Sequence, residues 1–474
     1  MLPRSENYQR WAVEMRHDGM FRAGERVGVA VSGGPDSVLL LDFLSQFGGK
    51  AGLTLAVVHF NHHLRGEESE EDERFVRRLA RDRKLPFFAG EAHVAERARE
   101  RRRNLEATAR ELRYRFFFSL VSQGKLEKVA TAHTASDQAE TVLLRLLRGA
   151  GTRGLGGIYP TREGKIVRPF LSLTRAMVEQ EVAARKLETR TDSSNLDPRF
   201  QRNKIRLELL PLIEQEYNPE IIRLLTQLAA RARDDESFLE DQARERARPW
   251  RVREGASEKI PLQPLVEFHP AIARRVLRQT IQAVQGSLRG LTHQHVENVR
   301  RLAIEAQSGR KSSLPGGLEA RKEFGWLILS PASAENRHRE FSYRVTLPGI
   351  VRVPELGAVF EFKIVQASSP GKRYNNKGDL TLKAEEMGAE VVLRNWRAGD
   401  RYQPAGSRRP EKLKELFRRS RIPASQRPTW PVIEGAGGIL WVRGFPPAQT
   451  TPTRRQARQY VEIIEKPLHS SETS

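Results

Sequence analysis

Residues 27–44 have the sequence VGVAVSGGPDSVLLLDFL, and this stretch decides the fold. Its first five residues are apolar and rich in valine, which favours a buried strand, and its last seven, VLLLDFL, favour a helix. The turn between them contains Gly33 and Gly34, which let several backbone N–H groups point toward one place. Because the start of a helix adds its dipole there, the turn predicts a site for an anion such as a phosphate.

The alternation of strand and helix continues along the chain. Apolar runs at 53–59, 85–89 and 128–131 predict strands, and the intervening periodic segments predict helices at 68–84, 104–122 and 137–148. Strands that alternate with helices pair in parallel, and their mostly apolar character fits a sheet covered on both faces. The predicted fold class of residues 1–217 is therefore α/β, a doubly wound parallel-sheet domain.

The pattern changes after residue 217. Apolar residues at helical spacing, with hairpin-like alternation near 314–330, predict a small, mainly helical domain over 218–335. Short β-like runs between Pro and Gly turns predict a β-rich α+β domain over 341–465. Residues 466–474 are predicted to be a disordered tail.

The net charge of the chain indicates which kinds of partner it binds. The 474 residues include 81 Lys and Arg against 59 Asp and Glu, a net charge of +22, which favours a polyanion such as nucleic acid or an acidic membrane surface. Half of this excess lies in residues 391–460, where fifteen Lys and Arg stand against four Asp and Glu. No apolar run approaches the roughly 20 residues of a membrane-spanning helix, so no membrane partner is expected.

The absence of cysteine excludes disulfides, iron–sulfur clusters and thiolate zinc sites. The first residues, MLPRSENYQRWAVEM, contain no apolar core. No signal peptide is therefore expected, and a cytoplasmic location is predicted.

The turn SGGPDS is predicted to bind the phosphates of a nucleotide through Ser32, Gly33, Gly34, Pro35, Asp36 and Ser37. Asp36 would repel a phosphate unless a cation lies between them, and Mg²⁺ bridges carboxylate and phosphate oxygens. Asp36 is therefore the predicted metal ligand. The structural alternative is a plain turn in which an aspartate or a serine caps the helix.

Two further polar groups follow predicted strands, at the edge where open parallel sheets bind ligands. The histidines of HFNHHLR, residues 59–65, suggest a metal, but no acidic or thiolate companion stands at a fixed spacing, so contact with a substrate or a phosphate is preferred. His133 follows the fourth strand, and Asp137 and Glu140 lie three residues apart on one face of the next helix. The alternative for these carboxylates is capping of the helix N-terminus.

Arginines mark two other segments. Arg110 and Arg113 project from one face of helix 104–122, where an exposed basic surface is the alternative to a site. Residues 149–157, GAGTRGLGG, contain a GxGxxG pattern, but they follow a helix and so do not form a dinucleotide-binding turn. They predict a mobile loop whose Arg148 and Arg153 could close over a charged ligand.

Together these segments resemble the N-type ATP pyrophosphatase (PP-loop) superfamily, and within it the tRNA(Ile)-lysidine synthetase family. The similarity covers nearly the whole chain in several ordered blocks, among them SGGPDS, HFNHHLRG, ATARELRYRFF, TAHTASDQAET, RPFLSLTR, DSSNLDPRFQRNKIRLELLP and LRNWRAGDRYQP. It implies an enzyme that uses ATP to adenylate the C2 oxygen of the wobble cytidine of an isoleucine tRNA with a CAU anticodon, releasing pyrophosphate. The side-chain amine of L-lysine then displaces AMP to give lysidine, which changes codon reading from AUG to AUA.

The resemblance also implies roles for individual residues, with ATP and Mg²⁺ as cofactors. The predicted catalytic residues are Asp36, Arg113, His133 and Asp137. Arg206 would neutralise phosphate charge, Asp137 and Glu140 would hold an ammonium group of lysine, and His133 would orient or deprotonate the attacking amine. The predicted tRNA contacts are Arg202, Lys412, Lys414, Arg418, Arg419 and Arg421. A homodimer is left open.

The chain departs from the family pattern in two places, and the first of these keeps an alternative open. Thr134 and Ser136 stand where the family usually has a second histidine and a second consecutive aspartate, and Glu411-Lys412-Leu413-Lys414 replaces paired lysines. A catalytically lapsed tRNA-binding protein is therefore the alternative function, although the retained acidic and histidine residues favour activity. A tRNA sulfur-transferase is excluded by the absence of cysteine, and a small-molecule synthetase would not need the basic C-terminal region.

Overall fold

A computed structural model describes residues 6–17, 19–100, 103–190, 201–332, 340–366, 380–422, 426–449 and 459–468. The chain divides into two compact units, Met1–Phe238 and Leu239–Ser474. Among the described residues, no helix combines the length and the apolar character needed to cross a membrane.

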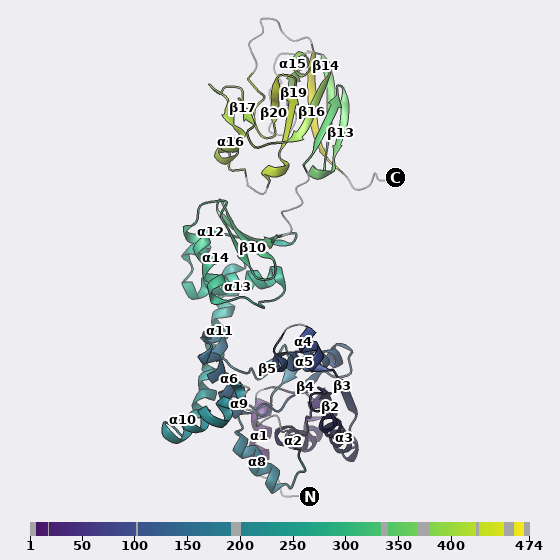
Figure 1. The fold of residues 1–474 in the computed structure, drawn as a ribbon, viewed down its shortest axis with the longest axis vertical. Helices are drawn as coiled ribbons and strands as arrows, with labels where there is room; N and C mark the ends of the chain where they lie inside the picture. The colour runs from purple at the N-terminus through teal and green to yellow at the C-terminus, as the bar shows by residue number, and fades with distance from the viewer. Residues whose placement is uncertain are drawn as a thin grey trace. The chain divides into compact units, whose positions relative to one another are not determined.

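The first unit is built on a six-stranded sheet with the strand order β3-β2-β1-β4-β6-β5 (Figure 1). Its strands are β1 (Arg26–Ala30), β2 (Thr54–Asn61), β3 (Phe87–Glu91), β4 (Lys128–Ala130), β5 (Thr161–Arg162) and β6 (Ile166–Val167). All pairs are parallel except β5 with β6, so the predicted parallel sheet is confirmed, with an antiparallel edge added. The antiparallel pair forms because only the tight turn 163–165 joins its strands, with positive φ at Glu163 and Gly164.

Helices cover both faces of this sheet, because alternate residues of each strand point to opposite sides. In β2, Leu55 and Val57 belong to one core, whereas Ala56 and Val58 belong to the other. The first core packs against α1 (Glu6–His17), α2 (Pro35–Ala51), α3 (Glu67–Asp82) and α8 (Arg175–Ala184), and the second against α5 (Leu105–Ser122). The doubly wound arrangement predicted from the sequence is therefore confirmed.

A third hydrophobic cluster fixes the helices that follow residue 200. It joins α6 (Ala135–Leu147) to Ile205 and Leu210 and to Leu225 and Ala229 of a long helix. This region consists of α9 (Gln201–Lys204), a π-helical turn (Ile205–Leu209), α10 (Leu210–Glu216) and α11 (Ile221–Ala247). The short helices α4 (Val94–Glu100) and α7 (Thr152–Leu155) complete the first unit.

In the second unit, residues 252–331 combine helices with a five-stranded antiparallel sheet. The helices are α12 (Leu262–Glu267), α13 (Pro270–Gln285) and α14 (His293–Glu305). The sheet has the order β7-β8-β11-β10-β9, with β7 (Val252–Glu254), β8 (Ser257–Pro261), β9 (Lys311–Leu314), β10 (Leu318–Glu323) and β11 (Trp326–Pro331). The predicted hairpin is confirmed by the pairing of β10 with β11.

The remainder of the second unit contains two four-stranded antiparallel sheets around one core, as the prediction of a β-rich α+β domain requires. One sheet has the order β12-β16-β19-β20: Ser342–Thr346, Glu390–Asn395, Pro431–Gly435 and Gly438–Val442. The other has the order β13-β14-β21-β15: Gly349–Val353, Ala358–Gln366, Gln459–Pro467 and Leu380–Lys383. The smaller elements are α15 (Ala384–Met387), β17 (Arg401–Tyr402), β18 (Glu411–Lys412) and α16 (Leu413–Arg419).

The predicted domain limits at 217, 335 and 465 stay predictions. Helix α11 runs from Ile221 to Ala247 and so passes from the first compact unit into the second. Of the predicted tail, Lys466 and Pro467 belong to β21, and residues 469–474 lie outside the described residues.

Candidate active site

The glycine turn, residues 32–37, lies at the carboxyl end of β1 and at the start of α2. Gly33 has φ of +100°, a left-handed conformation that favours glycine over residues with a Cβ. The Ser32 N–H donates to Ser37 Oγ at 3.1 Å, and the Ser37 hydroxyl donates to the Gly34 carbonyl at 2.9 Å. No side chain caps α2 at Gly34, so its first N–H groups face the turn. The turn therefore has the geometry of an anion site.

Asp36, in the first turn of α2, carries the one buried carboxylate oxygen of the described residues without a hydrogen-bond partner, Oδ1. Burial, followed by repulsion from Asp137, raises the pKa of Asp36 to about 6. An unpaired carboxylate beside an anion site fits Mg²⁺, which binds through one or two carboxylates together with substrate phosphates and water. No group of three or more His, Asp or Glu side chains in the described residues forms a complete metal site, so the phosphates would have to supply further ligands.

Two carboxylates and two arginines form the charge cluster, defined as Asp137 and Glu140 on α6 together with Arg202 and Arg206. Arg202 donates from Nε to Glu140 at 2.8 Å and from Nη2 to Asp137 at 2.9 Å. Arg206 donates from Nε to Glu140 at 2.5 Å and from Nη2 to Asp137 at 3.3 Å. The predicted common face of the two carboxylates is confirmed, and it binds arginines that come from 60 residues further along the chain.

Asp137 also caps the N-terminus of α6, which was the alternative role predicted for the carboxylates of this helix. Asp137 accepts a hydrogen bond from the Thr134 N–H at 3.0 Å, and the Asp137 N–H donates to Thr134 Oγ1 at 3.3 Å. Burial alone would raise the pKa of Asp137, but Arg202, His133 and the Thr134 N–H outweigh it and hold that pKa below its usual value. Capping and the charge cluster therefore use different oxygens of one carboxylate.

Thr134 and Ser136, which depart from the family pattern, both have hydrogen-bond partners in this chain. Thr134 is fully buried and caps α6, and the Ser136 hydroxyl accepts a hydrogen bond from the Arg175 N–H at the start of α8 at 3.1 Å. Thr134 therefore stabilises the start of α6, and Ser136 connects α6 with α8.

His133 lies just beyond the carboxyl end of β4, and its Nδ1 is 3.0 Å from Thr131 Oγ1. Burial lowers the pKa of His133 well below its usual value, and the positive charges of Arg168, Arg110 and Arg113 lower it further against the opposing effect of Asp137. The imidazole is therefore neutral near pH 7 and can accept a proton.

Arg110 and Arg113 are half-buried on α5, and their guanidinium groups lie 4.9 Å and 6.0 Å from the centre of the Tyr114 ring. The alternative of a fully exposed basic helix face is therefore wrong. Burial lowers the pKa of Arg113, and Arg110 and Arg202 lower it further. Within the described residues, Arg113 forms no ion pair, so its charge remains available for a ligand.

The loop at 149–157 is held by side chains of two helices. Arg145 on α6 donates to the carbonyl oxygens of Gly154 and Gly157 at 2.9 Å and 2.7 Å, and Arg233 on α11 donates to that of Gly156 at 3.0 Å. Arg148 donates to Gln201 at 2.7 Å. These bonds argue against the predicted mobility of the loop. The sequence could not reveal the bonds from Arg233 and to Gln201, because both residues lie far along the chain from the loop.

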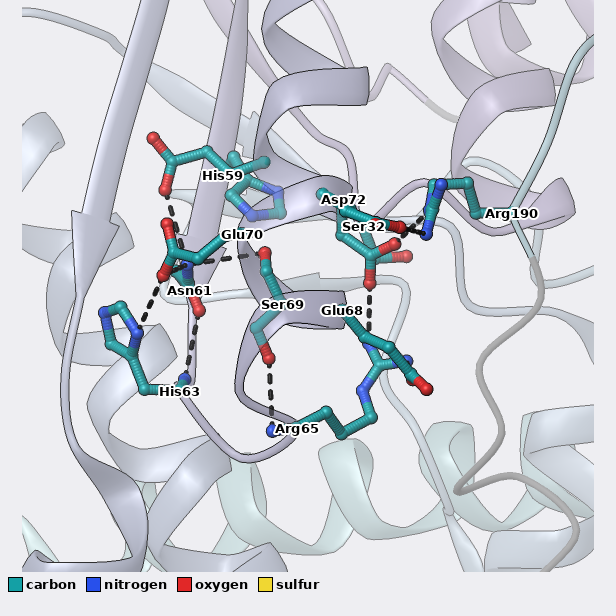
Figure 2. A network of polar contacts seen from close by, with 12 residues as sticks. Ser32, His59, Asn61, His63, Arg65, Glu68, Ser69, Glu70, Asp72 and Arg190 are labelled. Atoms are coloured by element: carbon teal, nitrogen blue, oxygen red, sulfur yellow. Dashed lines mark hydrogen bonds and ion pairs between the residues drawn. The ribbon is translucent and has the colours of Figure 1, made fainter.

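The histidine-containing segment at the end of β2, residues 59–65, supports the glycine turn (Figure 2). The His59 ring bonds the Val31 carbonyl at 2.8 Å, and the His63 ring lies between Glu70 at 3.1 Å and Glu91 at 3.0 Å. These contacts occupy both ring nitrogens of His63 and Nδ1 of His59, and the predicted contact of this segment with a substrate or phosphate stays a prediction.

Arg190 connects the same network to the turn and was missed in the sequence. Its backbone N–H donates to the Gly33 carbonyl at 2.9 Å, and its Nε donates to Asp72 at 2.5 Å. Arg65 donates to the other oxygen of Asp72 at 2.6 Å, as Figure 2 shows. No spacing pattern could have indicated Arg190, because it lies more than 100 residues from its partner on α3.

The predicted tRNA contacts near the C-terminus lie on the exposed side of α16. Leu413, Leu416 and Phe417 of this helix are buried. The basic residues are exposed: Lys412, Lys414, Arg418, Arg419 and Arg421. Arg418 lies 4.0 Å from Glu415 and Arg419 lies 2.9 Å from Glu411, and surface ion pairs of this kind are weak enough to exchange for a phosphate.

Comparison with known proteins adds three matching family models. A PP-loop domain matches residues 5–213, a TilS substrate binding domain matches 260–327, and a TilS substrate C-terminal domain matches 391–463. The tRNA(Ile)-lysidine synthase of Solibacter usitatus is 38% identical over 434 residues, which cover 90% of this chain and 95% of the relative. That of Caldanaerobacter subterraneus is 33% identical, with 90% of each chain covered. A crystal structure of a TilS C-terminal domain covers 27% of this chain and 100% of its own, at 26% identity and a TM-score of 0.24.

Replacement of Arg206 by alanine tests the charge cluster. The Glu140 side chain is 1% exposed, so R206A should lower the free energy of unfolding by about 2 kcal/mol. A buried charge left fully unpaired costs roughly 3–5 kcal/mol. The expected loss is smaller because Arg202 still pairs with Glu140. The matched control is R223A, which removes an arginine whose glutamate partner is exposed, and it should change stability by less than about 0.5 kcal/mol. Denaturant titration measures both, and equal losses would contradict the buried cluster.

The protonation of His133 can be followed by NMR titration of its ring, assigned with H133N. Because burial and nearby arginines lower its pKa, the ring should stay neutral as the pH falls through 6.5 and gain a proton only at lower pH. D137N removes the carboxylate that favours the charged ring and should lower the pKa further. A ring that titrates at or above 6.5 would show that His133 is not buried among positive charges.

Proposed function

Because the chain belongs to the tRNA(Ile)-lysidine synthase family, a family of ligases, we propose that it uses ATP and Mg²⁺ to attach L-lysine to C2 of the wobble cytidine of CAU-anticodon isoleucine tRNA. The observation that carries this proposal is that an anion turn, an unpaired carboxylate and a neutral imidazole all stand at the carboxyl edge of one parallel sheet. Open α/β sheets bind their ligands at that edge.

The first step needs a place for the leaving group of ATP. The cytidine C2 oxygen attacks the α-phosphorus, and the bond from that phosphorus to the β-phosphate oxygen breaks. The backbone N–H groups of the glycine turn, with the Ser32 and Ser37 hydroxyls, would hold the pyrophosphate. Asp36 would hold Mg²⁺, which neutralises phosphate charge when bound. Arg113 has no ion-pair partner among the described residues and would face the developing negative charge.

Lysine binding requires the charge cluster to open. Asp137 and Glu140 are the proposed acceptors for an ammonium group, but both are bound to Arg202 and Arg206. The cluster has two positive and two negative charges, so departure of one arginine leaves a net negative charge. We infer that Arg206 moves toward ATP phosphate and Arg202 toward RNA phosphate, which frees carboxylate oxygens for lysine. Arrival of the other substrates would then increase the affinity for lysine.

In the second step the lysine amine must be neutral when it attacks C2. His133 would orient the amine or accept its proton, because the ring lies next to the carboxylate that holds the amine. Since burial lowers the pKa of His133, desolvation must also lower the pKa of the lysine ammonium for this transfer to occur. The new C–N bond forms at C2, and the bond from C2 to the adenylate oxygen breaks, releasing AMP. Nearby arginines then offset the charge of the departing phosphate.

Binding of the rest of the tRNA is assigned to the basic surface around α16, which belongs to the substrate C-terminal domain. The alternative of a lapsed binding protein rested on Thr134 and Ser136, and both have structural partners in this chain. A cytoplasmic location and a homodimer stay predictions.

Release of AMP tests the reaction directly. Purified protein with ATP and Mg²⁺ should release AMP only when both the tRNA and L-lysine are present, because the adenylated cytidine is the species that lysine attacks. D36N should abolish release while leaving tRNA affinity unchanged, since Asp36 serves the nucleotide. AMP formed equally well without tRNA would indicate a small-molecule enzyme, and loss of tRNA binding in D36N would contradict the assignment of Asp36.

Replacement of Arg418, Arg419 and Arg421 by glutamine tests the surface around α16. Each arginine that contacts a phosphate displaces a counterion from the RNA. The triple variant should therefore bind tRNA more weakly, and the slope of log K against log salt concentration should become less steep by about 2. R344Q is the control, since Arg344 is 83% exposed in β12 of the same unit and is not a predicted contact. Filter binding at several salt concentrations measures the slope, and an unchanged value in the triple variant would remove α16 from the interface.

A further inference from the structure

Three arginine side chains contact Tyr114, next to the candidate active site. The Tyr114 arginine cluster is defined as Arg110, Arg162 and Arg168 around the Tyr114 ring. Arg168 Nη2 donates to the Tyr114 hydroxyl at 3.0 Å, and Arg110 Nη2 lies 3.4 Å from the same oxygen. The guanidinium of Arg162 stands 5.0 Å from the centre of the Tyr114 ring and 5.4 Å from that of Phe118. Side chains from α5, β5 and the residue after β6 therefore meet at one point.

The positive charge of this cluster is not balanced by the protein. Within the described ranges, Arg110 and Arg168 form no ion pair, and the salt bridge of Arg162 is to its exposed neighbour Glu163 at 3.4 Å. Arg168 is 2% exposed, and its Nε is buried without a hydrogen-bond partner. Burial lowers the pKa of Arg110, and the charges of Arg168, Arg202 and Arg162 lower it further. A bound anion would stabilise guanidinium groups that gather on one tyrosine without carboxylate partners.

The order of the strands places the cluster relative to the reaction. Along the carboxyl edge of the sheet, the glycine turn follows β1, His133 follows β4, and Arg168 follows β6. The Thr131 N–H donates to the Val167 carbonyl at 2.9 Å, which joins the last two positions. The cluster and the glycine turn therefore lie on opposite sides of His133.

We propose that the Tyr114 arginine cluster binds a phosphodiester of the RNA strand next to the cytidine that reacts. This inference rests on the proposed function, in which the cytosine lies near His133 and the triphosphate tail of ATP occupies the glycine turn. The strand that carries the cytosine must then leave on the side away from the turn, where the cluster lies. Arginine suits this role because its planar guanidinium donates two parallel hydrogen bonds to phosphate oxygens.

Two substitutions test the cluster without opening the core. Arg162 is 47% exposed, so R162Q removes a charge and an aromatic contact but leaves Tyr114 covered. Y114F removes the hydroxyl that Arg168 and Arg110 share, while the ring remains. The matched control is R115Q on the same helix, whose arginine is 61% exposed and pairs with Glu111 at 3.2 Å. R162Q and R115Q should keep the melting temperature of the unchanged protein. Y114F leaves Nη2 of the buried Arg168 without its acceptor and should lower the melting temperature, so binding is measured well below that temperature.

The probe is an anticodon stem-loop RNA with a CAU loop, titrated by fluorescence anisotropy at several salt concentrations. R162Q should weaken binding about tenfold and reduce the salt slope by about 1, and Y114F should weaken binding about threefold, whereas R115Q should match the unchanged protein. The KM for ATP, measured by AMP release, should stay the same in all variants.

Three outcomes would overturn the inference. R162Q with unchanged RNA affinity and salt slope would show that no phosphodiester binds there. A raised KM for ATP with normal RNA binding would assign the cluster to the nucleotide. An equal loss of RNA affinity in R115Q would show that only the overall positive charge of this surface matters, and not the cluster. If the unchanged protein binds the stem-loop but releases no AMP with full-length tRNA and lysine, the proposed function fails, and the binding comparison still decides the inference.

Discussion

Parallel pairing of β1 with a strand on each side is the constraint on which the site depends. Because β2, β1, β4 and β6 all run in one direction, the residues that follow them emerge at one edge of the sheet. Each strand end contributes one kind of chemistry: an anion turn after β1, a histidine after β4 and an arginine after β6. An antiparallel neighbour would have sent its following loop to the opposite edge.

The charges at this edge are arranged in two ways. Around Asp137 and Glu140 the protein neutralises its own carboxylates with arginines, and every charged oxygen there has a partner. Around Tyr114 the arginines have neighbours of the same sign, and Asp36 has an unpaired oxygen. In the balanced group every carboxylate is paired before any substrate arrives, so loss of one partner destabilises the fold, whereas the unbalanced groups would be stabilised by ligands of opposite charge.

Several motifs of the family serve the architecture of the site. His59, Asn61 and Arg65 bind α3 or the end of β1, and Asp72 links Arg65 to Arg190, whose backbone holds the Gly33 carbonyl. The glycine turn is therefore held from the side of α3 and by the bond from the Ser32 N–H to Ser37, and the first N–H groups of α2 face the ligand. A turn that binds phosphate without large side chains needs this support, because its own residues make few contacts.

Some of this could be predicted from the sequence because the signals are local. The apolar run before SGGPDS, the alternation of strands and helices, and the one-face spacing of Asp137 and Glu140 follow from the period of strand and helix, and the structure confirms them. The two-residue strands β5 and β6 are too short to show a period, so the antiparallel edge was not visible. The polar strands of the middle sheet were missed for a similar reason, because β7 and β9 are short and carry few apolar residues.

The tertiary structure alone decided which charges meet. Arg202 and Arg206 reach Glu140 across more than 60 residues, and Arg168 reaches Tyr114 across 54. A sequence determines the period and sign of its charges, but ion pairs depend on which elements pack together. That packing is set by burial of the apolar faces of α5, α6 and the sheet, which is a property of the whole fold and not of any one segment.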